Sequence, residues 1–188
     1  MRANQSITRR TVVAAAALVP VAAIKTAAAP DSVFSAEQRR TLETFIDRLV
    51  PADENGPGAT GCGAANYIDA ALADFLAGEK TAFLDGLKAV DDYARSKHDA
   101  AFAELAPEKQ DVVVAAIESS SRGFFDRVRR LTLEGMMSDP HYGGNTAFRG
   151  WDLIRYPGPR LAASSDDQRI KEALKPVRIS AYGGGHGH

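Results

Sequence analysis

The sequence predicts a small all-α protein, a bundle of about five helices followed by a long irregular C-terminal arm. First, each periodic segment repeats its apolar residues at the 3.6-residue spacing of a helix, and none alternates as a half-buried strand does. Second, glycines, prolines and capping residues divide these segments into lengths typical of globular helices. Third, the helical pattern ends at Ser138, although aromatic residues continue to Tyr156. Amphipathic helices of this kind bury their apolar stripes against one another as a bundle.

The first helix is expected to begin after Ser35, which can form a capping box with Gln38. Its apolar stripe follows the i, i+3, i+4, i+7 spacing and consists of Leu42, Phe45, Ile46 and Leu49. Pro51 ends this helix. Residues 53–63 hold four glycines and a proline, so they are expected to form a loop.

Four further helices are expected, each with its own apolar stripe, at approximately residues 64–77, 80–97, 107–118 and 122–137. The stripe of the second helix includes Phe75, and Gly78 ends the helix. Pro107 opens the fourth helix, at a first helical position where its missing N–H costs nothing. These helices complete a domain that is expected to cover residues 30–160.

The arm, residues 138–160, has almost no periodicity but carries large aromatic side chains such as Trp151 and Tyr156. Fixing about 20 irregular residues costs on the order of 20–40 kcal/mol of backbone entropy. The aromatic content is not typical of a disordered segment. The arm is therefore expected to pack either on its own bundle alone or against another subunit as well. Long irregular segments in compact domains are usually functional.

Residues 1–29 have the pattern of an export signal, with a basic start, an apolar run of 13 residues and small residues at the end. The run is too short to span a bilayer, which takes about 20 residues. Arg9 and Arg10 stand directly before a weakly apolar core, and this favours the twin-arginine route over an ordinary secretory signal. That route carries folded cargo, so the chain is expected in the periplasm, either with a cofactor or with a partner that holds one.

Composition excludes several classes of function. The signal holds four of the 23 basic residues and none of the 24 acidic ones, so residues 30–188 carry a net charge of about −5. This balance argues against nucleic acid or anionic lipid as a partner. Cys62 is the one cysteine, so the chain has no internal disulfide and no thiolate set for an iron–sulfur cluster or a c-type haem. The tail, residues 161–188, is polar and ends in glycines and histidines.

One alternative is a free-standing periplasmic enzyme or binding module that uses His141 and the loop at Asp53. Asp53 and Glu54 are adjacent carboxylates that could share acid–base work. Adjacent carboxylates in a solvated turn, however, are usually turn formers and caps. We therefore expect no catalytic, cofactor-binding or metal-binding residues in this chain.

Three segments resemble the small third subunit of gluconate 2-dehydrogenase and its relatives. The most specific is LTLEGMMSDPHYGGNTAFRGWDLIRYPGPR, residues 131–160, which matches the family pattern T-x-E-G, S-D-P-x-Y-G-G-N, G-W-x-x-I/L and Y/F-P-G-P. The segment RLVPADENGPGATGCGAANYID, residues 48–69, is similar to the family's I-P-A-D-x-x-x-P-G-A and F/Y-I-D. The segment FAELAPEKQDVVVAAIE, residues 102–118, fits F-x-x-L-x-x-E-Q-Q, with Lys109 where Gln is commoner. The resemblance covers about residues 34–160 and does not extend into the tail.

The resemblance implies an accessory subunit without catalytic residues of its own. Such subunits accompany a large flavoprotein that carries FAD and oxidises an alcohol group of a sugar or sugar acid. Electrons then usually pass to a c-type cytochrome subunit. The small subunit often supplies the export signal, so the flavoprotein would travel through the twin-arginine machinery bound to it. The residues expected to form the partner interface or its scaffold are Tyr142, Gly143, Gly144, Asn145, Trp151, Tyr156, Pro157 and Gly158.

Overall fold

The computed structural model describes residues 32–160, 165 and 173–183, which include six α-helices and no strand. The helices are α1 (Ala36–Leu49), α2 (Ala64–Ala73), α3 (Lys80–His98), α4 (Pro107–Ser120), α5 (Arg122–Met137) and α6 (Arg149–Leu153). The predicted all-α class is confirmed, and the sixth helix is a short one within the arm. The predicted export signal, residues 1–29, and much of the tail lie outside the described residues.

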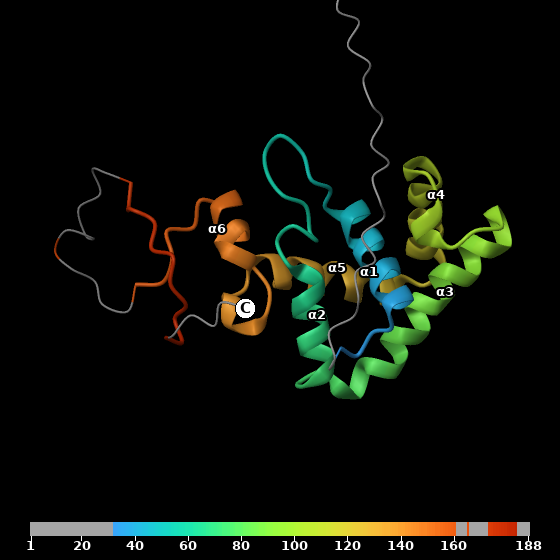
Figure 1. The fold of residues 1–188 in the computed structure, drawn as a ribbon, viewed down its shortest axis with the longest axis horizontal. Coiled ribbons are helices and arrows are strands. Elements are labelled where there is room, and N and C mark those ends of the chain that lie inside the picture. The colour runs from blue at the N-terminus through green and yellow to red at the C-terminus, as the bar shows by residue number, and fades with distance from the viewer. Residues whose placement is uncertain (1–31, 161–164, 166–172, 184–188) are drawn as a thin grey trace, which may run out of the picture.

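The first five helices enclose one apolar core. Phe45 of α1 is fully buried, and its ring centroid lies 6.0, 6.1 and 6.3 Å from those of Phe102, Phe124 and Phe125. In Figure 1, α3 and α4 lie on one side of this bundle, while α6 and the rest of the arm lie on the other. The arm therefore extends the bundle at one end instead of completing its centre.

The local signals for helix starts act as the sequence predicts. The Ser35 hydroxyl accepts a hydrogen bond from the Gln38 N–H at 3.2 Å, and the Gln38 side chain accepts one from the Ser35 N–H at 2.9 Å. This is the predicted capping box of α1. Pro107 is the first residue of α4, as expected for a residue that lacks an N–H.

The predicted end of the second helix is wrong by about one turn. Helix α2 ends at Ala73, and Asp74 leaves the helical region with φ −122° and ψ −104°. The N–H of Leu76 instead bonds to the carbonyl of Ala71, and a 3-10 turn follows at Ala77–Glu79. Because the helix stops early, the side chain of Phe75 turns outward and is 59% exposed, although its spacing predicts burial.

Candidate partner-binding surface

The arm begins at the end of α5 with a turn that its own sequence caps. Ser138 is the C-cap of α5, and the Asp139 carboxylate accepts a hydrogen bond from the His141 N–H at 2.9 Å. Pro140 opens a 3-10 turn, and Gly143 ends it with a φ of +87°. A positive φ is a conformation that glycine adopts without strain. The sequence signals for a turn at this point therefore describe the structure correctly.

Asn145 holds the arm in place. It is fully buried with a φ of +44°, and its N–H bonds to the carbonyl of Gly135 in α5 at 2.7 Å. Its amide nitrogen donates to the Ser138 carbonyl at 2.9 Å, and its amide oxygen accepts the Gly150 N–H at 2.9 Å. One side chain thus joins the end of α5 to the start of α6. Asparagine suits this position because it tolerates a left-handed backbone and has both a donor and an acceptor.

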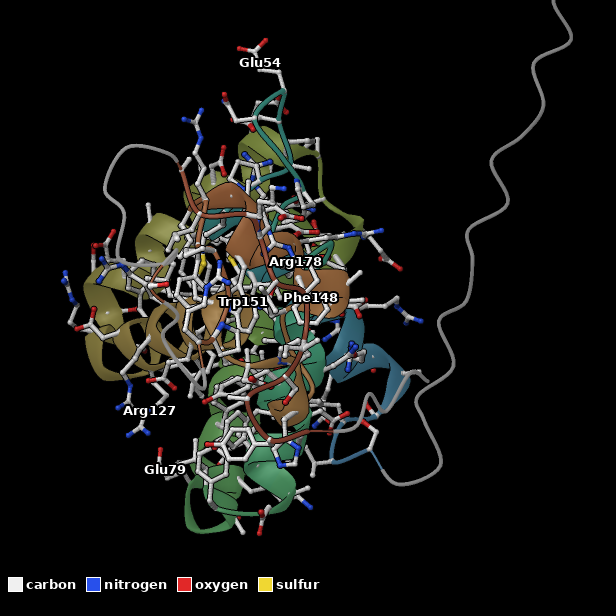
Figure 2. All side chains as sticks on the ribbon, turned by 90° about the vertical axis from the view of Figure 1, so that its left-hand side faces the viewer. Glu54, Glu79, Arg127, Phe148, Trp151 and Arg178 are labelled. Carbon is white, nitrogen blue, oxygen red and sulfur yellow. The ribbon has the colours of Figure 1, made fainter. Side chains whose placement is uncertain are left out.

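Trp151 is the apolar centre of the arm. Only 4% of it is exposed, and its indole N–H donates to the carbonyl of Met137 at 2.9 Å. Its ring lies 5.2 Å from the ring of Phe148 and 5.0 Å from that of Tyr156. Figure 2 shows Trp151 beside Phe148 and beneath the side chain of Arg178, which comes from the tail. A buried tryptophan with its N–H satisfied is a stabilising element.

Close backbone contacts fix the arm against α5. A side chain at Gly144 would overlap the carbonyl group of Gly135, and one at Gly150 would overlap that of Met136. Glycine is therefore required at both positions for a steric reason, independent of φ. The arm packs on its own domain along this line, as both expectations for the arm include, and contact with another subunit as well remains a prediction.

The predicted interface residues divide into two groups by exposure. Gly144, Asn145, Trp151 and Gly158 are buried within the chain, and Pro157 is half-buried. Gly143, Tyr142 and Tyr156 are exposed, the two tyrosines at 40% and 39%. The buried group can act only as a scaffold, whereas the exposed group can contact another molecule. Contact with a partner remains a prediction for the exposed group, and the scaffold role remains one for the buried group.

Exposed apolar side chains gather around this scaffold. We call Phe75, Tyr142, Ile154 and Tyr156 the aromatic face, since each is at least 39% exposed. Phe75 and Tyr142 line a largely apolar cavity of about 680 Å³ together with Tyr67 and Met137. Phe75 was missed as a surface residue because its spacing continues the stripe of α2, and only the early end of that helix turns it outward.

The polar groups at this cavity do not form a reactive pair. Tyr67 donates a hydrogen bond to the Glu134 carboxylate at 3.2 Å. Burial, together with the nearby charge of Glu134, raises the pKa of Tyr67 to about 12. The phenol therefore stays protonated at neutral pH and serves as a donor to the carboxylate.

The structure gives no support to the alternative site at His141 and Asp53. The Asp53 carboxylate accepts hydrogen bonds from the Asn55 side chain and from backbone N–H groups in its own turn, and these bonds lower its pKa. Glu54 stands at the tip of that loop, away from the arm (Figure 2). The His141 ring stacks on Tyr182 at 4.6 Å. Among the described residues, no cluster of three or more His, Cys, Asp or Glu side chains could hold a metal ion.

Cys62 is likewise placed as a structural residue. It is fully buried, its carbonyl accepts the Thr146 N–H at 2.9 Å, and burial raises the pKa of its thiol. A protonated, buried thiol is a poor nucleophile. The role of Cys62 is structural, because the hydrogen bond of its carbonyl links the loop before α2 to the arm.

A comparison with protein-family models matches residues 36–158 to gluconate 2-dehydrogenase subunit 3. The chain belongs to this family. The matched region runs from the first residue of α1 to Gly158, so it contains the whole scaffold described above. The family confirms the resemblance seen in the sequence, and its description is that of one subunit of a multi-subunit dehydrogenase. Neither the curated proteins nor the solved structures that were compared with the chain gave a match.

The family match also separates the arm from the tail. Residues 173–183 lie beyond the matched region, although the structure places them against the arm. Within the part of the chain that the structure describes, none of the helices is both long enough and apolar enough to cross a membrane.

Proposed function

We propose that this subunit 3 family member is a non-catalytic partner of a large FAD-containing dehydrogenase that oxidises a sugar or sugar acid. It stabilises the flavoprotein by presenting the aromatic face to it. FAD belongs to the large subunit, and a c-type haem belongs to a third, cytochrome subunit where one is present. The family membership supports the dehydrogenase assembly, and the geometry of the arm supports the mode of binding.

The observation that carries this proposal is an exposed aromatic face on a rigid support. Large apolar side chains at the surface mark contact sites for other proteins, and tyrosine is enriched at such sites. Tyr142 and Tyr156 are adjacent to Asn145 and Trp151, which are anchored to α5 by hydrogen bonds of 2.7–2.9 Å. A surface that is already ordered loses little entropy on binding, so its contacts contribute more of their free energy to affinity.

The export role rests on the sequence of residues 1–29, with Arg9 and Arg10 before the apolar run. In this proposal the flavoprotein folds around FAD inside the cell and leaves bound to this chain, through the twin-arginine machinery, for the periplasm. The test is Arg9→Lys with Arg10→Lys. We expect the flavoprotein to remain in the cytoplasm of cells that carry this variant. Normal periplasmic dehydrogenase activity would contradict the export role without affecting the interface.

Affinity purification tests the assembly itself. The full chain is purified from its native cells under mild conditions, and the eluate is analysed by mass spectrometry and by its flavin absorption spectrum. We expect a large flavoprotein in a fixed ratio to this chain. Purification of the chain alone, colourless and monomeric, would contradict the proposal.

A further inference from the structure

The tail returns to the arm in the described segment 173–183, which we call the strap. It runs antiparallel to the arm, since its contacts pass from the arm's end to its start as the strap proceeds. The Lys175 carbonyl accepts a hydrogen bond from Arg160 at 2.7 Å, and the Val177 N–H donates to the Pro157 carbonyl at 2.7 Å. Further along, the Ala181 N–H donates to Asp139 at 2.8 Å.

The strap occupies polar groups of the aromatic face. Its Tyr182 hydroxyl lies 2.6 Å from that of Tyr142, and Arg178 bonds to the Tyr156 carbonyl at 3.2 Å and pairs with Asp152. Tyr182 also helps to enclose a cavity of about 420 Å³, whose other walls include Trp151, Ile154 and Tyr156. Four members of the predicted partner interface, Tyr142, Tyr156, Pro157 and Gly158, are therefore in contact with the strap of the same chain.

The backbones of the arm and the strap approach closely at Gly158. This glycine has a φ of +91°, and a side chain there would overlap the Val177 carbonyl. The close approach of the two backbones thus depends on a glycine of the arm. Gly183 provides a comparison, because its φ is also positive, at +74°, but a Cβ added there would meet no atom within 4 Å. Gly183 therefore has no steric role.

The strap is held weakly in spite of this fit. None of its residues is buried, and Leu174, Ile179 and Tyr182 are 38%, 50% and 60% exposed. Among the described residues, its attachment consists of hydrogen bonds, the ion pair with Asp152 and the contacts of the Tyr182 ring with His141 and Tyr142, all at the surface, where each polar interaction contributes little. Asn145 and Trp151, by contrast, are buried against α5. The strap can therefore leave the arm without unfolding the domain.

We infer that the strap is an internal placeholder for an extended segment of the flavoprotein, which displaces it from the arm on binding. The inference rests on the proposed function. The displacing segment would have a backbone N–H that bonds to the Pro157 carbonyl in place of Val177. It would also carry an apolar or aromatic side chain that fills the cavity beside Trp151 and Ile154. This is how extended peptides are generally recognised, with main-chain bonds for affinity and pockets for specificity.

The first test needs no partner and measures amide hydrogen exchange in the full chain by NMR. We expect the Val177 and Ala181 amides to exchange at least about 100-fold faster than that of Asn145, because the strap opens without the domain. Gly158→Ala should accelerate them further, whereas Gly183→Ala, the matched control, should not. Equal protection of Val177 and Asn145, or no effect of Gly158→Ala, would overturn the inference.

The second test measures binding of the purified flavoprotein to the full chain and to Val177→Pro/Tyr182→Ala, which leaves the arm intact. Since the closed strap reduces the fraction of binding-competent chain, its release should tighten binding about tenfold or more. Ile179→Ala, which removes an exposed strap side chain without a described bond, should bind as the unmodified chain does. Unchanged or weaker binding by the double variant would overturn the strap's role alone. If no form of the chain bound the flavoprotein, the proposed function would be contradicted. The displacement of the strap, which rests on it, would be contradicted too.

Discussion

The indole N–H of Trp151 donates a hydrogen bond to the carbonyl oxygen of Met137, the last residue of α5, over 2.9 Å. The carbonyl groups of a helix's last turn have no partner within the helix. Trp151 thus satisfies one of them while it buries its own ring. This contact fixes the arm at the end of the bundle. It thereby also positions the exposed Tyr142 and Tyr156 of the arm.

Replacing Trp151 therefore tests the scaffold. Trp151→Ala should lower the free energy of unfolding by about 3–5 kcal/mol, because it removes a large buried side chain and leaves a cavity. Trp151→Phe keeps part of the ring but loses the hydrogen bond, and it should cost less. Urea denaturation measures both. Equal, small losses would show that the ring is not packed as described, and partner binding by the two variants should follow the same order.

The close approach of the arm to α5 predicts opposite effects for two glycines. Gly144→Ala should destabilise the protein by at least about 1–3 kcal/mol, since the new methyl group overlaps the Gly135 carbonyl. Gly123 lies in the first turn of α5 with nothing in reach of an added methyl group, so Gly123→Ala should stabilise the protein by about 0.5 kcal/mol or less. Thermal unfolding of the two variants gives the comparison. A Gly144→Ala protein as stable as the original would contradict the described contact.

The thiol of Cys62 is expected to be inert in the folded protein. Burial raises its pKa, so little thiolate is present at neutral or mildly basic pH, and reagents cannot reach it. Iodoacetamide at pH 8 should leave native protein unmodified and should alkylate it fully in urea, as mass spectrometry would show. Rapid modification of native protein would indicate that the loop before α2 opens.

The attachment of the strap is expected to depend on pH through Asp139. Burial raises the pKa of this carboxyl, but hydrogen bonds from the His141 N–H, the Ser180 hydroxyl and the Ala181 N–H outweigh burial and leave the pKa below its ordinary value. Because this pKa is depressed, the stabilisation that the Asp139 hydrogen bonds give is complete above the pKa of the unfolded chain, about 3.9. It is lost as the pH falls through the lower pKa of the folded protein. The charge of the neighbouring His141 also lowers the pKa of Asp139.

The Ala181 amide proton reports this titration by NMR. Its chemical shift should show a transition below about pH 4, where Asp139 takes up its proton. Asp139→Asn retains an acceptor but not the charge, so the same shift should no longer titrate. The absence of a transition below about pH 4 in the unmodified protein, or the same transition in Asp139→Asn, would mean that Asp139 is not bonded to the strap.

Local patterns in the sequence were sufficient to predict the bundle. The capping box at Ser35 and the proline at position 107 mark helix starts that the structure reproduces. The end of α2 was not predictable in this way, because the apolar spacing continues through Phe75 while the hydrogen bonds change at Asp74. Periodicity describes which residues a helix would bury, but it does not fix where its hydrogen bonds stop.

The arm and the strap depend on contacts between distant residues, which a single sequence does not display. The glycine and asparagine residues at 143–145 indicated an unusual backbone, but not that Asn145 would bond to α5 and α6 together. Asp139 and Ala181 are 42 positions apart, and neither belongs to a periodic pattern. The resemblance to subunit 3 sequences pointed to the arm as a functional segment, and the structure shows which of its residues are free to make contacts.

The most direct test of the central claim is the dissociation constant of the complex with the flavoprotein when the aromatic face is reduced. Phe75→Ala/Tyr156→Ala removes two exposed rings and spares Tyr142, which holds the strap. Val112→Ala is the matched control, since Val112 is 57% exposed and belongs to α4, a helix on the other side of the bundle from α6 (Figure 1). We predict binding at least about tenfold weaker for the double variant and unchanged binding for the control. Unchanged binding by the double variant, with its folding intact, would contradict the claim that this face binds the flavoprotein.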